Sequence, residues 1–159
     1  MQPNPKCLQN PDVCDDIAKF HEKFGLEYND DPRNLEPALQ AFREKFILEE
    51  FAEFQRAVSD EHAILQDAYL NFADPEAALL NEDLVRVREQ QLDAVVDLIY
   101  VLLGYAYLRG WYVPEAWRRV HEKNMLKERV APHDPKARSA WDVVKPAGWK
   151  PANLKDLVS

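Results

Sequence analysis

The stretch from Leu92 to Leu108 constrains the fold more than any other part of the sequence. It reads LDAVVDLIYVLLGYAYL, and apart from Asp93 and Asp97 every side of a helix over these residues would be apolar. A helix that is apolar all round is buried in a protein core or in a membrane. With about 17 residues and two acids, the stretch is too short and too charged for a membrane span. We therefore expect the central, buried helix of a helical bundle and no membrane contact.

Asp93 and Asp97 are the anomaly in this stretch. In a helix they lie about 40° apart, so they point the same way, and Gly104 and Leu108 continue the face that they share. Burying one unpaired carboxylate costs several kcal/mol, and burying two near each other costs more. We therefore expect a cation beside the two aspartates. Gly104 on the same face would let another element approach closely.

Three glutamates repeat this anomaly on an earlier segment of the chain, residues 42–58. In a helix they share one arc with the apolar side chains of Phe42 and Phe46. Acids at positions that face a core indicate a functional site. The three are Glu49, Glu50 and Glu53. Because oxygen-only ligands suit Mg²⁺, with Mn²⁺ as a substitute, we expect the glutamates and the two aspartates to form a divalent metal site.

Residue types exclude two competing kinds of site. Carboxylate di-iron centres in helical bundles use Glu-x-x-His pairs, and no histidine of this sequence has a glutamate three residues before it. Neither GxxxxGK[ST] nor GxGxxG occurs, so a glycine loop would not hold a phosphate. Lys45 flanks the acidic arc, where it either pairs with the glutamates or binds a substrate phosphate.

Composition and charge set the class of protein. The chain has 159 residues with only four glycines, and its long segments have helical periodicity, which favours a single all-α domain. The net charge of -8 disfavours nucleic-acid binding, which needs a basic surface. Cys7 and Cys14 are expected to be reduced thiols rather than a disulfide. Because the first residues lack the apolar core of a signal peptide, we expect a cytoplasmic protein.

Turn and cap signals divide the chain into a bundle of four to five helices between two irregular ends. We expect a flexible N-terminal segment over 1–11, a helical catalytic bundle over 12–130 and an extended tail over 131–159. The expected helices cover about 12–24, from Leu35 or Pro37 to about Ser59, about 63–72, from Pro75 or Glu82 to Arg109, and from Pro114 to about Arg129. In the first, Phe20 and Phe24 either pack in the core or line a base pocket. Trp141 and Trp149 should pack the tail onto the bundle or a partner subunit.

At this point the sequence resembles a known family. Glu49-Glu50-x-x-Glu53, followed by an acidic pair on the next long apolar helix, is similar to the all-α NTP pyrophosphatase superfamily, which includes MazG-like enzymes and dimeric dUTPases. The segments 121–127 and 145–151 resemble the later parts of such proteins. One departure concerns the second motif, which is usually ExxD. Aligned on Asp97, the glutamate position is Ala94, and the acid is Asp93, one residue earlier.

The resemblance implies a Mg²⁺-dependent hydrolase that cleaves a nucleoside triphosphate between its α- and β-phosphates, releasing a monophosphate and pyrophosphate. It implies Mg²⁺ ligands at Glu49, Glu53, Asp93 and Asp97, and a further ligand or general base at Glu50. Phosphate contacts are expected from Lys123, Asn124, Lys127 and Lys45, although helix-dipole stabilisation also explains the first three. The implied substrate is a (d)NTP, with dUTP as a candidate. The implied assembly is a homodimer or a tetramer, with the pocket completed by a second subunit.

Two other functions are compatible with the same residues. The first is a non-catalytic helical interaction protein whose acids bind a structural divalent ion. The second is a nucleotide-binding regulator with a degraded site, which Ala94 suggests. Turnover of a nucleotide panel separates the enzyme from both.

Overall fold

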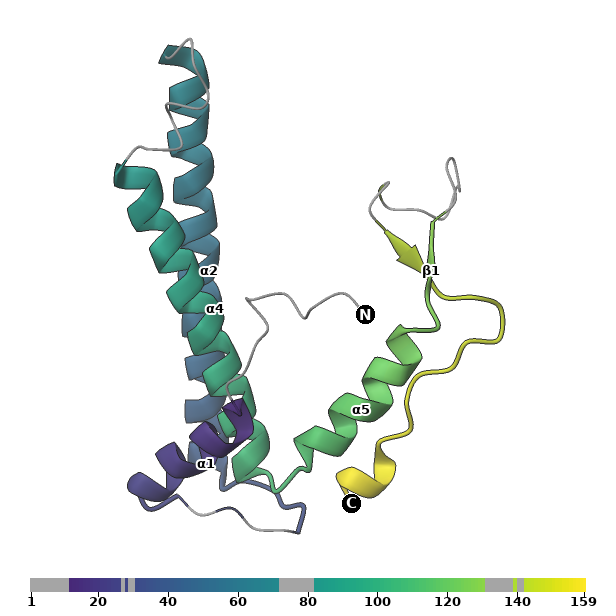
Figure 1. Ribbon diagram of the computed structural model, residues 1–159. Helices are drawn as coiled ribbons and strands as arrows, with labels where there is room; N and C mark the ends of the chain where they lie inside the picture. The colour runs from purple at the N-terminus through teal and green to yellow at the C-terminus, as the bar shows by residue number, and fades with distance from the viewer. Residues whose placement is uncertain (1–11, 27, 29–30, 72–81, 131–138, 140–141) are drawn as a thin grey trace.

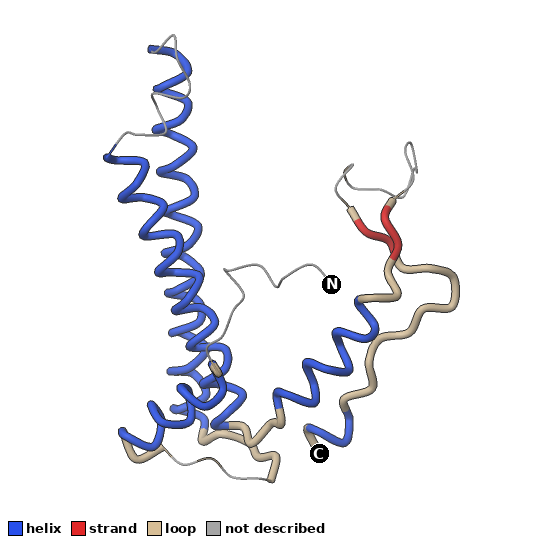
Figure 2. The backbone as a smooth tube through the Cα atoms, in the orientation of Figure 1, coloured by secondary structure: helices blue, strands red, loops and turns tan. Residues whose placement is uncertain are grey.

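The computed structural model describes residues 12–26, 28, 31–71, 82–130, 139 and 142–159. Its helices are α1 (Val13–Lys23), α2 (Pro37–Asn71), α4 (Glu82–Leu108) and α5 (Val113–Asn124), and a 3-10 turn, η2 (Lys155–Leu157), lies near the C-terminus. Two short strands, β1 (Glu128–Arg129) and β2 (Val143–Val144), pair antiparallel. The expected all-α fold with a C-terminal tail is confirmed (Figure 1, Figure 2).

The helices α2 and α4, which we call the helical pair, lie side by side and antiparallel (Figure 1). Near one end, Nε2 of Gln40 donates to the hydroxyl of Tyr105 (3.0 Å), and further along, Nε2 of Gln91 donates to the carbonyl of Ala57 (3.3 Å). The short helix α1 packs across the C-terminal part of α4. This arrangement brings the faces of three helices together near the end of the pair that holds the C-terminal part of α4.

The first helix forms where the sequence places it. Its N-cap is Asp12, whose Oδ1 accepts a hydrogen bond from the amide of Asp15 (3.1 Å). At the other end, Gly25 has a φ of 70°, which lets the amide of Leu26 donate back to the carbonyl of His21 (2.9 Å). Both caps agree with the expected limits of about 12–24.

The second helix is longer than expected. We predicted an end near Ser59 and a separate short helix over about 63–72, whereas α2 continues without a break to Asn71. Residues 59–62 contain no proline or glycine that would stop the helix. Glu61 also joins this part to α4, since its carboxylate accepts from Arg88 (2.6 Å) and Gln91 (2.8 Å). The predicted start at Pro75 lies outside the described residues, and α4 is described from Glu82.

The prediction that α4 is buried on every side is wrong for the single chain. Only 17% of its most apolar 18-residue window is buried, and Leu92 is 66% exposed. By length and composition alone, α4 could cross a membrane, a test that core helices also pass. The reason for the exposure is that α2 covers one side of α4 and α1 covers only its C-terminal part, while α5 points away from the pair (Figure 1).

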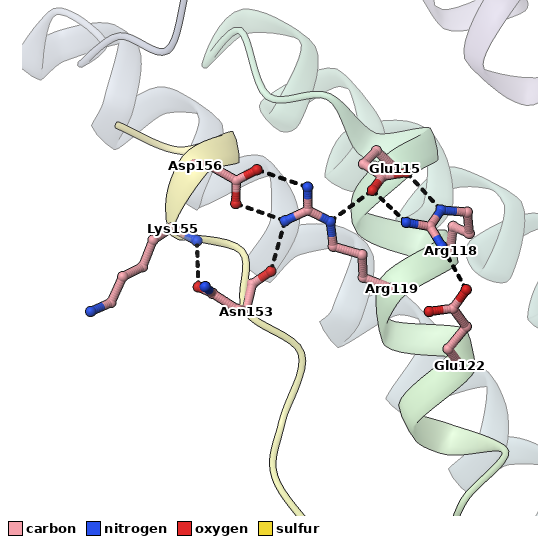
Figure 3. Close-up of polar contacts among 7 residues, drawn as sticks. All are labelled: Glu115, Arg118, Arg119, Glu122, Asn153, Lys155 and Asp156. Atoms are coloured by element: carbon pink, nitrogen blue, oxygen red, sulfur yellow. Dashed lines mark hydrogen bonds and ion pairs between the residues drawn. The ribbon is translucent and has the colours of Figure 1, made fainter.

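The helix α5 and the tail form a separate body, which we call the arm, residues 113–130 and 142–159. Its helix ends at Asn124 rather than near Arg129, because residues 128–129 pair with the tail as a strand. Arg119 joins the helix to the tail, with two 2.7 Å contacts to Asp156 and one of 2.9 Å to the carbonyl of Asn153 (Figure 3). The tail thus packs on α5 rather than on the helical pair.

Trp149 contributes to this packing, as we expected from the cost of leaving a tryptophan side chain exposed. Its indole Nε1 donates to the carbonyl of Lys123 (2.9 Å), and its ring lies 4.6 Å from the ammonium of Lys145. Trp141 lies outside the described residues.

Candidate functional site

The helical pair brings four of the five predicted acids within electrostatic range of the fifth, Glu50. Burial raises the pKa of Glu50, and the negative charges of the other four acids raise it further. Burial likewise raises the pKa of Asp97, with additional repulsion from Asp93 and Glu53. Two helices that are adjacent only in the folded chain therefore present their carboxylates to one common region. These five acids are Glu49, Glu50, Glu53, Asp93 and Asp97.

The five acids are less buried than the sequence indicated. Glu50 and Asp97 are half-buried, whereas Glu49, Glu53 and Asp93 are exposed. The pair leaves an open side, so only the two carboxylates nearest the contact between the helices lose solvent. Within the part of the chain that the structure describes, no three His, Cys, Asp or Glu side chains converge into a formed metal site.

The donor set nevertheless suits a hard divalent cation. All five side chains offer carboxylate oxygens, and Mg²⁺ takes one or two carboxylates together with water and phosphate oxygens rather than a closed protein cage. The mutual repulsion that raises the pKa of Glu50 and Asp97 is the repulsion that such a cation would relieve. Lys45 lies in the same region, where its ammonium pairs with Glu49 at 3.1 Å on an exposed surface. The ion-pair role considered for Lys45 is the one seen in this conformation.

A cavity of about 440 Å³ adjoins the acids, between α1, α2 and α4. Glu50 and Asp97 line it together with Arg43, and its remaining walls are apolar and aromatic apart from His21. Those walls consist of Phe20, His21, Phe46, Tyr100 and Val101. The cavity therefore joins two carboxylates, one guanidinium and a set of rings that could pack against a flat organic group.

Sequence reasoning missed Arg43, His21 and Tyr100 as site residues, although two of them carried a signal. Arg43 precedes Glu50 by seven residues, or two helical turns, so both lie on one side of α2. Tyr100 follows Asp97 by three residues and shares its side of α4. His21 had no such signal, because only the packing of α1 brings it to the cavity. Phe20, one of the two aromatic residues considered for a base pocket, does line the cavity.

His21 is held in one orientation behind the cavity. It is 1% exposed, and its Nδ1 lies 2.8 Å from the carbonyl of Ile17, to which it can only donate. Its Nε2 is then the acceptor for Nη2 of Arg43, at 2.6 Å. Burial, chiefly, and the charge of Arg43 lower the pKa of His21, so the ring is neutral near pH 7.

The expected close approach at Gly104 is confirmed at this point. A Cβ atom on Gly104 would lie 2.7 Å from Cε1 of His21 and 3.0 Å from Nη2 of Arg43. Both separations are too short for an unperturbed contact. The absence of a side chain at residue 104 is therefore what lets the imidazole and the guanidinium meet against α4.

The predicted phosphate contacts at residues 123, 124 and 127 lie on the arm and not at this cavity. Among the described residues, no hydrogen bond or ion pair joins Lys123, Asn124 or Lys127 to the five acids. The ammonium of Lys127 lies 5.9 Å from the ring centroid of Trp149, within the arm. Since α5 leads away from the helical pair (Figure 1), one chain does not bring these residues and the acids together.

Comparison with known proteins adds one finding to this geometry. A family model described as phosphoribosyl-ATP pyrophosphohydrolase matches residues 17–124, about two thirds of the 159-residue chain. The matched range contains the whole helical pair, the five acids and the cavity, and it ends at the last residue of α5. No curated protein matches the chain.

Proposed function

The chain belongs to the phosphoribosyl-ATP pyrophosphohydrolase family, and from this premise we propose that it hydrolyses a nucleoside triphosphate between the α- and β-phosphates. Membership supports a hydrolase that acts on a nucleotide pyrophosphate bond. The proposed cleavage between the α- and β-phosphates is supported by one observation: five acids from α2 and α4 lie beside a cavity with aromatic walls. The products would be a nucleoside monophosphate and pyrophosphate.

Glu49, Glu53, Asp93 and Asp97 would hold Mg²⁺, or Mn²⁺ in its place, because their oxygens suit either ion. When bound, the metal neutralises charge on the phosphate oxygens and on the leaving pyrophosphate. Glu50 takes the role of general base or of a further ligand. Its raised pKa favours the first role, since a carboxylate with a higher pKa accepts a proton more readily.

The chemistry assigned to Glu50 is a balanced hydrolysis. The carboxylate accepts a proton from water as the water oxygen bonds to the α-phosphorus. The bond from that phosphorus to the bridging oxygen breaks, and the electron pair leaves with the pyrophosphate. The half-buried position of Glu50 suits this role, because partial desolvation raises the basicity of the carboxylate while leaving it open to water.

The nucleoside would pack against the rings of the cavity. Phe20, Phe46 and Tyr100 offer flat apolar surfaces in the wall of the cavity that Glu50 and Asp97 also line. A (d)NTP is the proposed class, with dUTP as one candidate, and phosphoribosyl-ATP, which the family's description names, is the second compound to include in the test.

The assembly that we propose is a homodimer. Support comes from a stripe along α4 that the single chain leaves uncovered, on which the side chains of Leu92, Val96 and Ile99 are 66%, 50% and 46% exposed. An apolar stripe of this length calls for a covering surface. A second copy would supply one, and a dimer of dimers is the larger alternative. In such a dimer the arm of one subunit could bring Lys123, Asn124 and Lys127 to the phosphates bound by the other.

The test is a panel of (d)NTPs and phosphoribosyl-ATP, first with Mg²⁺ and then with Mn²⁺. The assay measures release of the monophosphate and pyrophosphate. We expect both products in equal amounts for at least one compound and neither after EDTA is added. Release of orthophosphate in place of pyrophosphate would contradict the proposed bond. No turnover of any compound would favour the non-catalytic alternative.

A further inference from the structure

The guanidinium of Arg43 lacks a counter-charge in the part of the chain that the structure describes. Its one hydrogen bond there joins Nη2 to Nε2 of His21, at 2.6 Å, and its Nε is buried without a partner. No ion pair links it to Glu50 or Asp97, although all three side chains line the same cavity. A cation therefore shares a cavity with two of the acids and pairs with neither of them.

This arrangement is costly unless something else completes it. Burial removes water from the guanidinium of Arg43. One hydrogen bond to a neutral imidazole replaces only part of this hydration, because the Nε–H has no partner. In the arm, by contrast, Arg118 and Arg119 each contact carboxylates at 2.7 Å. Arg43 differs because His21 and Gly104 fix its Nη2 at the wall, which keeps the guanidinium in place.

We propose that Arg43 is a phosphate-binding residue of the candidate site and that His21 is the residue that positions it. This inference rests on the proposed function. The guanidinium has five N–H donors in a planar fork; His21 engages one and the Nε–H is buried, so the remaining Nη N–H groups can donate to phosphate oxygens. A polyphosphate placed between the metal-binding acids and Arg43 would receive charge neutralisation from both sides. The aromatic walls would then receive the nucleoside.

The assignment of His21 depends on its tautomer. Because the carbonyl of Ile17 fixes the proton on Nδ1, Nε2 is free to accept from Arg43. Gly104 contributes space, since any side chain there would push the imidazole or the guanidinium away from α4. Three helices thus act together, α1 through His21, α2 through Arg43 and α4 through Gly104.

The first experiment replaces the guanidinium. Arg43→Gln should weaken binding of inorganic pyrophosphate in the presence of Mg²⁺, measured by calorimetry, by about 10- to 100-fold, the range expected for charge-assisted hydrogen bonds. It should raise KM for the hydrolysed nucleotide by a similar factor. Arg43→Lys should fall between Arg43→Gln and wild type, because it keeps the charge and loses the fork. The matched control is Arg86→Gln, which removes an exposed charge paired with Asp83 on the same chain.

The second experiment separates positioning from packing. His21→Phe removes the acceptor, and His21→Gln places a carbonyl oxygen near the position of Nε2. If His21 positions Arg43, His21→Phe raises KM while His21→Gln restores most of the affinity. In the double variant His21→Phe/Arg43→Gln, the two losses should not add. Circular dichroism identifies a variant that fails to fold, in which case His21→Gln and Arg43→Gln decide the matter.

The outcomes separate this inference from the proposed function. If Arg43→Gln hydrolyses nucleotide with wild-type KM and binds pyrophosphate as wild type does, the inference fails and the hydrolase proposal stands. If wild type hydrolyses no nucleotide, the pyrophosphate measurement decides alone. A loss specific to Arg43→Gln then supports the phosphate site, and equal or absent binding in both proteins overturns it. Additive losses in the double variant would remove the positioning role of His21.

Discussion

In the arm, carboxylates lie beside arginines, whereas in the helical pair they lie beside one another. Arg118 and Arg119 lower the pKa of Glu115 to about 2, and Arg119 lowers the pKa of Asp156 (Figure 3). In the pair, burial and neighbouring acids raise the pKa of Glu50 and of Asp97. The same type of side chain therefore holds the arm together and destabilises the pair. The carboxylates of the arm are thus neutralised by its own arginines, while the repulsion within the pair fits the proposal that its acids bind a metal ion.

The largest effect should come from exchanging one carboxylate in each region for its amide. Glu50→Gln keeps the shape and removes a base or ligand, so hydrolysis should fall by more than about 100-fold. Glu115→Gln, its control in the arm, should retain turnover, since the Glu115 carboxylate accepts hydrogen bonds from Arg118 and Arg119 of α5, away from the five acids. Initial rates of pyrophosphate release measure both. Near-normal turnover by Glu50→Gln would show that its role is misassigned.

Two further variants test whether other residues of the proposed site contribute less than Glu50. Lys127→Ala should lower the rate less than Glu50→Gln, because a single phosphate contact is easier to lose than the base. Asp93→Ala should also reduce activity, since we propose Asp93 as a metal ligand in place of a glutamate at residue 94. Full activity of Asp93→Ala would show that this shifted acid has a structural role only.

The next effect concerns the exposed apolar stripe of α4, which we propose that a second subunit covers. Light scattering of wild type at micromolar concentration should give about twice the chain mass of 18.5 kDa. Ile99→Asp places a charge on the exposed apolar stripe of α4 and should yield a monomer with much reduced turnover. The proposed interface should exceed about 2,000 Å² in total, as obligate dimers do. Wild type that is monomeric and fully active would refute both the dimer and the shared pocket.

Metal removal should affect the two regions differently. Because a bound cation relieves repulsion among the five acids, thermal unfolding in excess Mg²⁺ should occur at a higher temperature than in EDTA. A ligand at 100 times its Kd stabilises by about 2.7 kcal/mol. The shift should shrink in Glu50→Gln and persist in Glu115→Gln. Identical midpoints with Mg²⁺ and EDTA would count against a metal site.

The smallest effects should appear in the pH dependence of stability. Glu115 has a folded pKa of about 2 against an ordinary value of 4.5, so its contribution is complete above pH 4.5 and is lost as pH falls towards 2. Glu50 has a raised pKa, so in metal-free protein its destabilising charge is removed as pH falls through that pKa towards 4.5. Denaturant titrations of Glu50→Gln and Glu115→Gln across this range test the opposite signs. Parallel curves for the two variants would contradict them.

The acids of the helical pair could be predicted from the sequence because helical periodicity places Glu49, Glu53 and Asp97 on definable faces. The family resemblance agreed with the family found, at the level of nucleotide pyrophosphohydrolases. Arg43 and His21 were missed because their contact joins α1 to α2, and no periodicity within one helix encodes it. Helical periodicity does not show which polar residues of two different helices come into contact.

The burial of α4 was misjudged for a related reason. Apolar periodicity shows that Leu92 and Ile99 need a cover, but it does not say whether that cover comes from the same chain. We assigned it to the chain's own bundle, whereas α5 turns outwards with the tail. The length of α2 was underestimated, since we predicted an end near Ser59 and a separate helix over about 63–72, although residues 59–62 contain no helix breaker.

Contacts within the arm join its tail to α5. Because Arg119 of α5 binds Asp156 of the tail, a rotation of the backbone at residues 109–112 should move α5, the strands and the tail together. Gly110, with a φ of 68°, sets the direction in which the arm leaves α4. A helix of 12 residues is about 18 Å long, so a rotation of about 10° at the glycine displaces its far end by about 3 Å. The reach of Lys123 and Lys127 therefore depends on a backbone angle at a glycine that precedes them by 13 and 17 residues.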